Sequence, residues 1–388
     1  MTLLTLMPLL FLSLVSAAAP PAGKAPAPAA PVAAEPERDD ELAESARELE
    51  ELRKAREGDE SSRAVDRALE FLASQQRDDG ALVGPKPKDG EEPIARLEST
   101  KTGYGMASTS LAIMAFLANG HVPGRGPYGE KLERAVAYIR SFAAPNGLVN
   151  HPQSVGRRIM YTHGFCTLML GEVFGMSRAD LDEVYRKAVR LILSAQDIPK
   201  GVNDAGGWRY TPDTGDSDMS HTGEMVSAIW VAKGCGMDVP QRNVDRAAEY
   251  IKHQHSANFG GFGYRGPGKG SYCTSGSGLL SLQLLGHRNS PEVVRTADAL
   301  SSEPITWRSA WFYLGVYYTN QAMFQMGGRY WERWRDHSSR LLLTHQNKDG
   351  SWPDAQGHSE RNIGPCYRTA FAVLALSIPN QILPSFQR

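Results

Sequence analysis

Two kinds of apolar segment alternate along the chain from about residue 61 onward. In the first kind, apolar residues recur every three or four positions and charged residues fill the opposite face, which predicts an amphipathic helix with one buried side. In the second kind, apolar and small residues surround the whole helix, which predicts a helix covered on every side. The amphipathic segments include 67–76, 134–139, 187–196, 246–251 and 340–346, and the apolar ones include 107–116, 164–170, 223–230, 276–285, 322–326 and 370–376.

The amphipathic segments end in related turns, so the chain reads as an internal repeat. Six pairs of helices, each pair about fifty residues long, can lie side by side and close into a ring with the apolar helices inside. A linear solenoid is the alternative, but it needs polar capping repeats, and neither end of the repeat region looks like one. We therefore predict an all-α fold, a six-hairpin α/α toroid over residues 61–388. The turns contain Asp-Gly80, Asn-Gly147, Gly206-Gly-Trp208, Gly260-Gly-Phe262 and Gly350-Ser-Trp352.

The residues before the repeats predict export. An apolar run from Thr2 to Val15 is too short to span a bilayer and is followed by Ser16-Ala-Ala-Ala19, which is typical of a signal peptide. The absence of Lys or Arg before Lys24 departs from that pattern. Residues 20–60 form an Ala/Pro-rich linker, expected to be disordered, and a short charged helix at 38–57. We expect a mature protein without a transmembrane segment in the periplasm or the extracellular space.

Charge and cysteine content exclude several classes of function. The 388 residues hold 42 basic and 43 acidic side chains, a formal net charge of −1, so no overall field attracts nucleic acid. The four cysteines are spaced neither as a disulfide framework nor as a Cys-x-x-Cys zinc site, and we expect them to be buried thiols. No metal and no cofactor is predicted.

The last turn carries a family resemblance. Gln346-Asn-Lys-Asp-Gly-Ser-Trp352 fits the Gln-x-x-x-Gly-x-Trp signature, the QW motif, of squalene and oxidosqualene cyclases. The repeats resemble the prenyltransferase/squalene-oxidase repeat family, which includes terpene cyclases and protein prenyltransferase β subunits. Exported bacterial members of unassigned activity look most similar, because they share the pattern at 206–220 and the segment 317–331. The resemblance covers about residues 61–384 and implies a terpenoid-cyclase-like toroid. In it the Gln and Trp are structural, satisfying helix-end groups and packing between repeats.

In a toroid the inner helices run parallel, so their N-termini open at one rim. Several helix N-termini, each with a partial positive charge, would converge there, together with arginines. This geometry favours a ligand with an anionic head group and an apolar tail, and tryptophans such as Trp311 could add an aromatic wall. The alternative is a rim filled by its own tyrosines and capping groups. The candidate ligand-binding residues at the rim are Tyr161, His163, Tyr272, Tyr317, Tyr367 and Arg368.

The segment from Asp216 to His221 holds the candidate catalytic residues. Asp216-Ser-Asp-Met-Ser220 resembles the Asp-x-Asp-Asp motif of class II terpene cyclases, whose middle Asp protonates an alkene. The resemblance makes Asp218 the acid, Asp216 its neighbour and His221 a hydrogen-bond partner. That role needs an aspartic acid kept protonated by burial and by nearby carboxylates. Met219 replaces the last Asp, however, and the alternative is that Asp218 or Ser220 only caps the inner helix.

The zinc site of the protein prenyltransferases does not carry over to this chain. Their zinc is held by Asp, Cys and His, and Cys273 matches the Cys. Ser271 stands where the Asp should be, and Arg368 stands where the His should be. One ligand of three is too few to hold zinc.

Two hypotheses about function remain. The first is an exported toroid that binds a partner protein or an apolar or amphipathic ligand, such as an isoprenoid, in or near its central cavity. The alternative is a squalene-type terpene cyclase, an isomerase or lyase that protonates an isoprenoid through Asp218. Known triterpene cyclases have two helical domains, whereas this chain has room for one toroid. Because Met219 also removes one carboxylate, the binding hypothesis is favoured.

Overall fold

Amphipathic and apolar helices alternate along the part of the chain that the structure describes. The structure is a computed structural model, and it describes residues 59–84, 104–152, 159–177, 179–357, 359–360 and 363–386. All of them belong to one structural unit, residues 53–388. The predicted signal peptide, the linker and the charged helix at 38–57 lie outside the described residues.

Twelve α-helices of the described chain form six hairpins, each an outer helix followed by an inner one. The outer helices bury one face, whereas nearly every described side chain of the inner helices is buried. The outer helices are α2 (Glu60–Ser74), α4 (Gly129–Arg140), α6 (Asp182–Gln196), α8 (Gln241–Gln254), α10 (Pro291–Ser302) and α12 (Gly328–Thr344). The inner helices are α3 (Tyr104–Leu117), α5 (Ile159–Met176), α7 (Met219–Gly234), α9 (Tyr272–Leu284), α11 (Phe312–Met326) and α13 (Pro365–Ser377).

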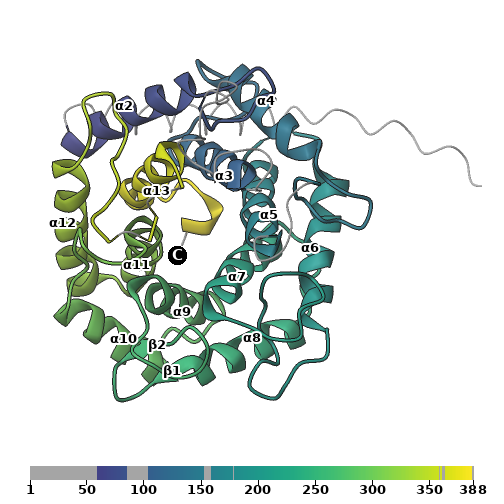
Figure 1. Cartoon of the computed structure of the whole chain (residues 1–388), viewed down its shortest axis with the longest axis vertical. Helices are drawn as coiled ribbons and strands as arrows, with labels where there is room; N and C mark the ends of the chain where they lie inside the picture. Colours follow the sequence, from purple (N-terminus) through teal and green to yellow (C-terminus); the bar gives the residue numbers. More distant parts are fainter. Residues whose placement is uncertain are drawn as a thin grey trace, which may run out of the picture. The chain divides into compact units, whose positions relative to one another are not determined.

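The inner helices close into a ring. Each packs against the next in the order α3, α5, α7, α9, α11 and α13, and α13 packs back against α3. Figure 1 shows this inner ring surrounded by the outer helices. The predicted α/α toroid is confirmed. The only strands of the described chain are β1 (His255–Ser256) and β2 (Gly261–Phe262), which pair antiparallel in the turn after α8.

Small residues set the spacing of the inner helices. A Cβ added at Gly223 of α7 would lie 1.7 Å from Oγ of Ser277 on α9. A Cβ added at Gly276 of α9 would lie 2.6 Å from Cγ2 of Thr319 on α11. The Ser277 hydroxyl can rotate away, but a Cβ at Gly276 would also lie 2.9 Å from the backbone nitrogen of Thr319, so a larger residue there would force α9 and α11 apart.

The QW turn joins the last hairpin to the first. The side-chain amide of Gln346 donates to the carbonyl of Ala64 on α2 at 2.7 Å and to that of Gly350 at 3.0 Å. The buried indole of Trp352 donates to the carbonyl of Leu342 on α12 at 2.8 Å. The motif therefore satisfies backbone groups and fastens α12 to α2, as the resemblance implies for a structural device.

The C-terminal segment packs against the inner helices α5 and α7. The 3₁₀ helices η2 (Ile378–Asn380) and η3 (Pro384–Phe386) follow α13, and η3 contacts α5 and α7. The backbone N–H of Ser385 donates to Oε1 of Glu172 at 3.1 Å. Burial raises the pKa of Glu172 to about 8, although the hydrogen bonds from Ser385 oppose this shift. In the described residues, no helix is both long enough and apolar enough to cross a membrane.

None of the four cysteines forms a disulfide. Cys166, Cys273 and Cys366 are buried, as expected, whereas Cys235 is partly exposed. Burial raises the pKa of the Cys166 thiol to about 12, so this thiol stays protonated at neutral pH.

Replacing Gly350 by Ala should destabilise the ring more than the same change at Gly286. Both residues have φ of +89°, where a Cβ costs about 1–2 kcal/mol. A Cβ at Gly350 would also lie 2.2 Å from the carbonyl oxygen of Arg67, whereas one at Gly286 meets nothing within 4 Å. Denaturant midpoints of the two variants measure the difference. Equal midpoints would show that the close approach of α2 to this turn adds nothing to stability.

The structure predicts that stability falls as pH rises through the range in which Glu172 loses its proton in the unfolded chain but keeps it when folded. That range runs from the ordinary value of 4.5 to about 8. Glu172→Gln keeps an oxygen for Ser385 and removes the ionisation, so its melting temperature should fall less between pH 5 and 8. Burial also raises the pKa of Glu224, so some pH dependence should remain. Identical pH profiles for the two proteins would contradict the assignment.

Candidate functional site

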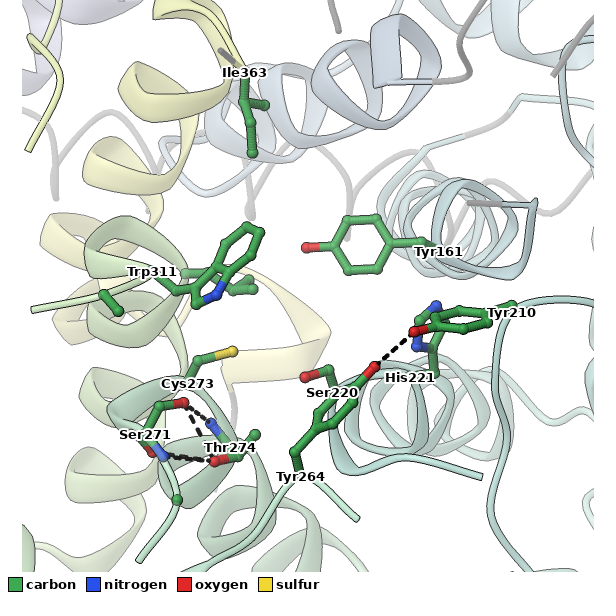
Figure 2. Close-up of a pocket in the computed structure, with 13 residues that line it drawn as sticks. Tyr161, Tyr210, Ser220, His221, Tyr264, Ser271, Cys273, Thr274, Trp311 and Ile363 are labelled. Carbon is green, nitrogen blue, oxygen red and sulfur yellow. Dashed lines mark hydrogen bonds between the residues drawn. The ribbon is translucent and has the colours of Figure 1, made fainter. Parts of the chain in front are cut away.

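A pocket of about 660 Å³ opens at the N-terminal ends of the inner helices (Figure 2). Tyr161 of α5, His221 of α7, Cys273 of α9 and Leu314 of α11 all line it, and each lies in the first turn of its helix. The predicted meeting of inner-helix N-termini at one rim is therefore confirmed for these four helices. The other described lining residues are Tyr210, Ser220, Tyr264, Gly270, Ser271, Thr274, Ala310, Trp311 and Ile363.

One wall of the pocket is apolar and carries a strained tryptophan. Trp311 precedes α11 with φ 53° and ψ 48°, the left-handed conformation that bulky residues rarely adopt. Its side chain is 40% exposed and projects across the pocket toward Tyr161 (Figure 2). Glu360 supports this helix end from outside, because its carboxylate accepts from the N–H groups of Tyr313 at 3.0 Å and Leu314 at 3.2 Å. Such strain is often found where a side chain clamps a ligand.

The opposite wall depends on the turn between α6 and α7. The N–H of Asp218 donates to the carbonyl of Trp208 at 3.0 Å, and the Trp208 indole donates to that of Ile192 on α6 at 2.7 Å. The carbonyl of Tyr210 accepts from Met160 at the start of α5 at 3.0 Å. The Gly206-Gly-Trp208 turn thus places both Tyr210 and the start of α7 at the pocket.

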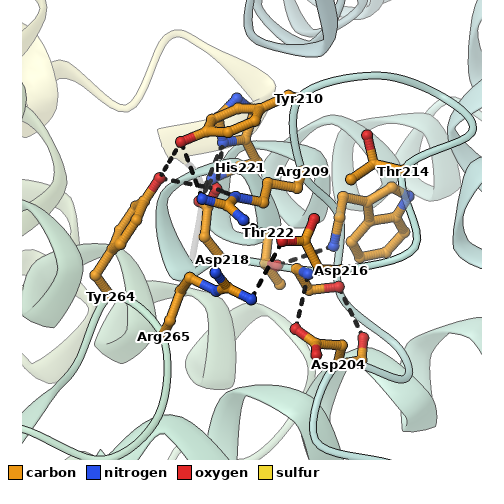
Figure 3. A network of polar contacts seen from close by, with 12 residues as sticks. Asp204, Arg209, Tyr210, Thr214, Asp216, Asp218, His221, Thr222, Tyr264 and Arg265 are labelled. Carbon is orange, nitrogen blue, oxygen red and sulfur yellow. Dashed lines mark hydrogen bonds and ion pairs between the residues drawn. The ribbon is translucent and has the colours of Figure 1, made fainter. Parts of the chain in front are cut away.

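Asp218 begins α7 and holds His221. Its Oδ1 accepts from the backbone N–H of His221 at 3.0 Å, which makes Asp218 the N-cap of the helix. Both carboxylate oxygens lie 3.0 Å from Nδ1 of the His221 ring. Oδ2 also accepts from Nε of Arg209 at 3.2 Å and from the hydroxyl of Tyr264 at 3.0 Å (Figure 3). The capping alternative from the sequence is what the structure shows.

These contacts hold Asp218 as a carboxylate. The side chain is fully buried, and burial alone would raise its pKa. The charge of His221 and the hydrogen bonds from His221 and Tyr264 act in the opposite direction and outweigh burial, so the pKa is lowered. The acid role expected from the sequence needs a raised pKa, and this environment does not provide one.

Asp216 lies behind the pocket wall rather than in it. Its carboxylate pairs with Arg209 and, at 3.2 Å, with Nη2 of Arg265. The two arginines neutralise the second carboxylate, so it does not help to protonate Asp218. The structure thus brings Asp216 and Asp218 close together, but as two carboxylates that both pair with Arg209.

His163, the other candidate histidine, has backbone groups as partners for both of its ring nitrogens. Nδ1 accepts from the N–H of Val149 at 3.1 Å, and Nε2 lies 3.2 Å from the carbonyl oxygen of Ala188. Burial lowers its pKa to about 4, so the ring is neutral. It stands where four of the other five hairpins have a hydroxyl that accepts a turn N–H, those of Thr109, Thr222, Ser275 and Thr369.

The remaining candidate ligand-binding residues, apart from Tyr161, do not line the pocket. Tyr272 donates its hydroxyl to the carbonyl of Glu303 at 2.8 Å. Tyr317 and Tyr367 are buried and pack against Phe371, with ring centroids 5.0 and 4.7 Å away. Arg368 donates to the carbonyl of Trp352 at 3.1 Å and to Asp354 at 2.7 Å.

Sequence reasoning missed Tyr210 and Tyr264. They lie in turns, 54 residues apart, and their hydroxyls are 3.1 Å from each other at the pocket wall. Tyr210 follows Trp208 by two residues, and an aromatic residue just after the repeated turn is the signal that could have marked it. In the described residues, no group of three His, Cys, Asp or Glu side chains could hold a metal ion.

Comparison with known proteins shows the fold alone. No family model matches the sequence, and no curated protein matches it. The solved α-1,6-mannanase GH76A of Salegentibacter sp. superposes with a TM-score of 0.59 at 10% identity, covering 82% of this chain and 98% of that one. The type II terpene cyclase MstE of Scytonema superposes with a TM-score of 0.53 at 13% identity, covering 84% and 99%. A protein from Actinoplanes reaches 0.51 at 16% identity, covering 82% and 98%.

We predict that Asp218→Asn destabilises the protein far more than Asp216→Asn. The first change puts an amide where a buried carboxylate contacts Arg209, His221 and Tyr264, and hydrogen bonds to a charged group contribute about 1.5–3 kcal/mol each. Asp216 is 31% exposed, and its loss should cost about 0–1 kcal/mol. Denaturant unfolding of both variants measures the contrast. A small loss at Asp218 would mean that its contacts with Arg209, His221 and Tyr264 contribute little.

Proposed function

We propose that the chain is a binding protein whose pocket at the inner-helix N-termini holds an apolar or amphipathic ligand. The observation that carries the proposal is the lining of the pocket. Its volume of about 660 Å³ suits a small organic ligand, and one wall consists of Trp311, Leu314 and Ile363. A largely apolar cavity with a few convergent polar groups is the usual form of such sites.

The distribution of charge supports a ligand that is neutral where it meets the wall. None of the thirteen described lining residues is Asp, Glu, Lys or Arg. Arg209, Arg265, Asp216 and Asp218 lie behind Tyr210 and Tyr264 and pair with one another. The anionic head group expected from the sequence therefore finds no Lys or Arg among the described lining residues.

The same geometry favours binding over acid-initiated cyclisation. Asp218 does not line the pocket, is screened by His221 and Tyr264, and has a lowered pKa. A protonating acid must reach its substrate and must hold a proton near neutral pH. Membership of the prenyltransferase/squalene-oxidase repeat family and export through residues 1–19 remain part of the proposal. The repeated turns, the fold likeness to a type II terpene cyclase and the apolar N-terminal run support it.

Nile red, a neutral dye that fluoresces in apolar surroundings, should bind the purified protein at one saturable site. Ala310→Trp places a large ring at the pocket mouth. Because this ring would occupy space that the dye needs, the substitution should weaken dye binding about tenfold or more. Val294→Trp adds the same ring on exposed α10, where Val294 is 40% exposed, and should leave binding unchanged. Fluorescence titration measures the affinity of the dye for the wild type and for both variants.

Native mass spectrometry tests the proposal independently. A co-purified apolar ligand that is lost in Ala310→Trp but kept in Val294→Trp would support it. Equal Nile red binding by all three proteins would place the dye elsewhere and contradict the proposal. Cyclised products from squalene, abolished by Asp218→Asn, would favour the enzyme instead.

A further inference from the structure

Nε2 of His221 is a buried polar atom without a hydrogen-bond partner. The residue is 5% exposed and lines the pocket. Its other ring nitrogen, Nδ1, is engaged by Asp218 (Figure 3). A buried polar atom without a hydrogen-bond partner costs free energy, so a ligand that supplies the partner gains affinity.

The ring of His221 cannot easily turn away from this position. Tyr161 meets it edge to face at a centroid distance of 5.8 Å, and Tyr210 does so at 5.2 Å. The Asp218 carboxylate holds the ring from a third side, with Oδ2 3.0 Å from Nδ1 of His221. Figure 2 shows Tyr161, Tyr210 and His221 together at one side of the pocket.

The hydrogen bonds behind His221 determine where its proton lies. An ionised carboxylate only accepts hydrogen bonds, so Nδ1 must donate to Asp218. The hydroxyl of Tyr264 also donates to Asp218, and it therefore accepts from Tyr210, 3.1 Å away. The hydroxyl of Tyr210 in turn accepts from Arg209 at 3.1 Å. Every donor in this hydrogen-bond network is directed toward the carboxylate, so an imidazole ring with a single proton keeps that proton on Nδ1 and a lone pair on Nε2.

We infer that the ligand of the pocket is an amphipathic alcohol whose hydroxyl donates to Nε2 of His221 while its apolar body packs against Trp311 and Leu314. The inference rests on the proposed function and names its ligand class. A carboxylate ligand would need a second proton on the ring and would bring another negative charge near Asp218. Arg209 and Arg265 already serve Asp216 and Asp218, and no described lining residue offers a further Lys or Arg.

The direct test compares three ligands with the same C15 chain: farnesol, farnesyl methyl ether and farnesoic acid. Each displaces Nile red from the full-length protein at pH 8. Farnesol should bind about tenfold or more tightly than the ether, which lacks the donor, and more tightly than the ionised acid. Nile red has no O–H or N–H group, so its own binding does not report on the donor.

Two substitutions at His221 separate its two nitrogens. His221→Asn keeps an amide donor near the position of Nδ1 and removes Nε2, so the preference for the alcohol should disappear. His221→Gln places an amide oxygen near Nε2 and should retain part of the preference. His253→Asn, on the exposed face of α8, is the matched control and should behave as the wild type. Melting temperatures of all variants establish that they fold.

The outcomes distinguish the inference from the proposed function. If farnesol and its ether displace the dye equally from the wild type, the inferred hydrogen bond from a ligand hydroxyl to Nε2 is contradicted, but the proposed binding function is not. The same holds if farnesoic acid binds most tightly, or if His221→Asn keeps the preference for the alcohol. If neither the dye nor any of the three ligands binds the wild type, the proposed function itself is overturned.

Discussion

A helix that is apolar on every side is stable in water only when other parts of the chain cover all of it. The six inner helices of the described chain meet this constraint by closing into a ring, where each contacts two inner neighbours and the outer layer. An open array would leave faces of α3 and α13 in water. The hydrogen bond from Gln346 to Ala64 lies where the last hairpin meets the first. The close approach of Gly223 to Ser277 sets how near neighbouring inner helices can lie.

The repeat supplies a scaffold, and the candidate site arises where one copy departs from it. Four hairpins use a Ser or Thr hydroxyl to accept a turn N–H, and the second uses His163 for the same purpose. Asp218 is a departure of another kind, because it caps α7 and also holds the ring of His221 one turn later. Positions i and i+3 of a helix start face the same way, so the pair is formed locally.

Charge balance behind the wall decides what the pocket can accept. Arg209 bridges Asp216 and Asp218, and its guanidinium lies 4.2 Å from the centre of the Tyr210 ring. The charged groups stabilise one another and hold the tyrosines in place. The pocket therefore presents aromatic rings, hydroxyls and one imidazole to its contents. Catalysis by a protonated aspartic acid would require the opposite arrangement, a carboxylate shielded from cations.

The toroid could be predicted from the sequence because its causes are local. Helical periodicity, the all-round apolar character of alternate helices and the repeated glycine turns are each visible within about twenty residues. The Asp216–His221 segment was also correctly located at the rim, since it directly precedes an apolar helix. The turn after α10 is less regular: α10 lacks the Gln and the Gly-x-Trp ending, and no outer helix was predicted there.

The roles of the individual side chains were decided only by the tertiary structure. His163 and His221 both lie near the N-terminal ends of inner helices, yet His163 hydrogen-bonds to Val149 and Ala188 whereas His221 lines the pocket. Arg368 turns to Asp354, and Tyr264 reaches Asp218 from 46 residues away. The sequence alone determined which helices are buried, because that follows from composition along one helix. Which of their polar groups find partners depends on neighbours distant in the chain, and only the closed ring brings those neighbours together.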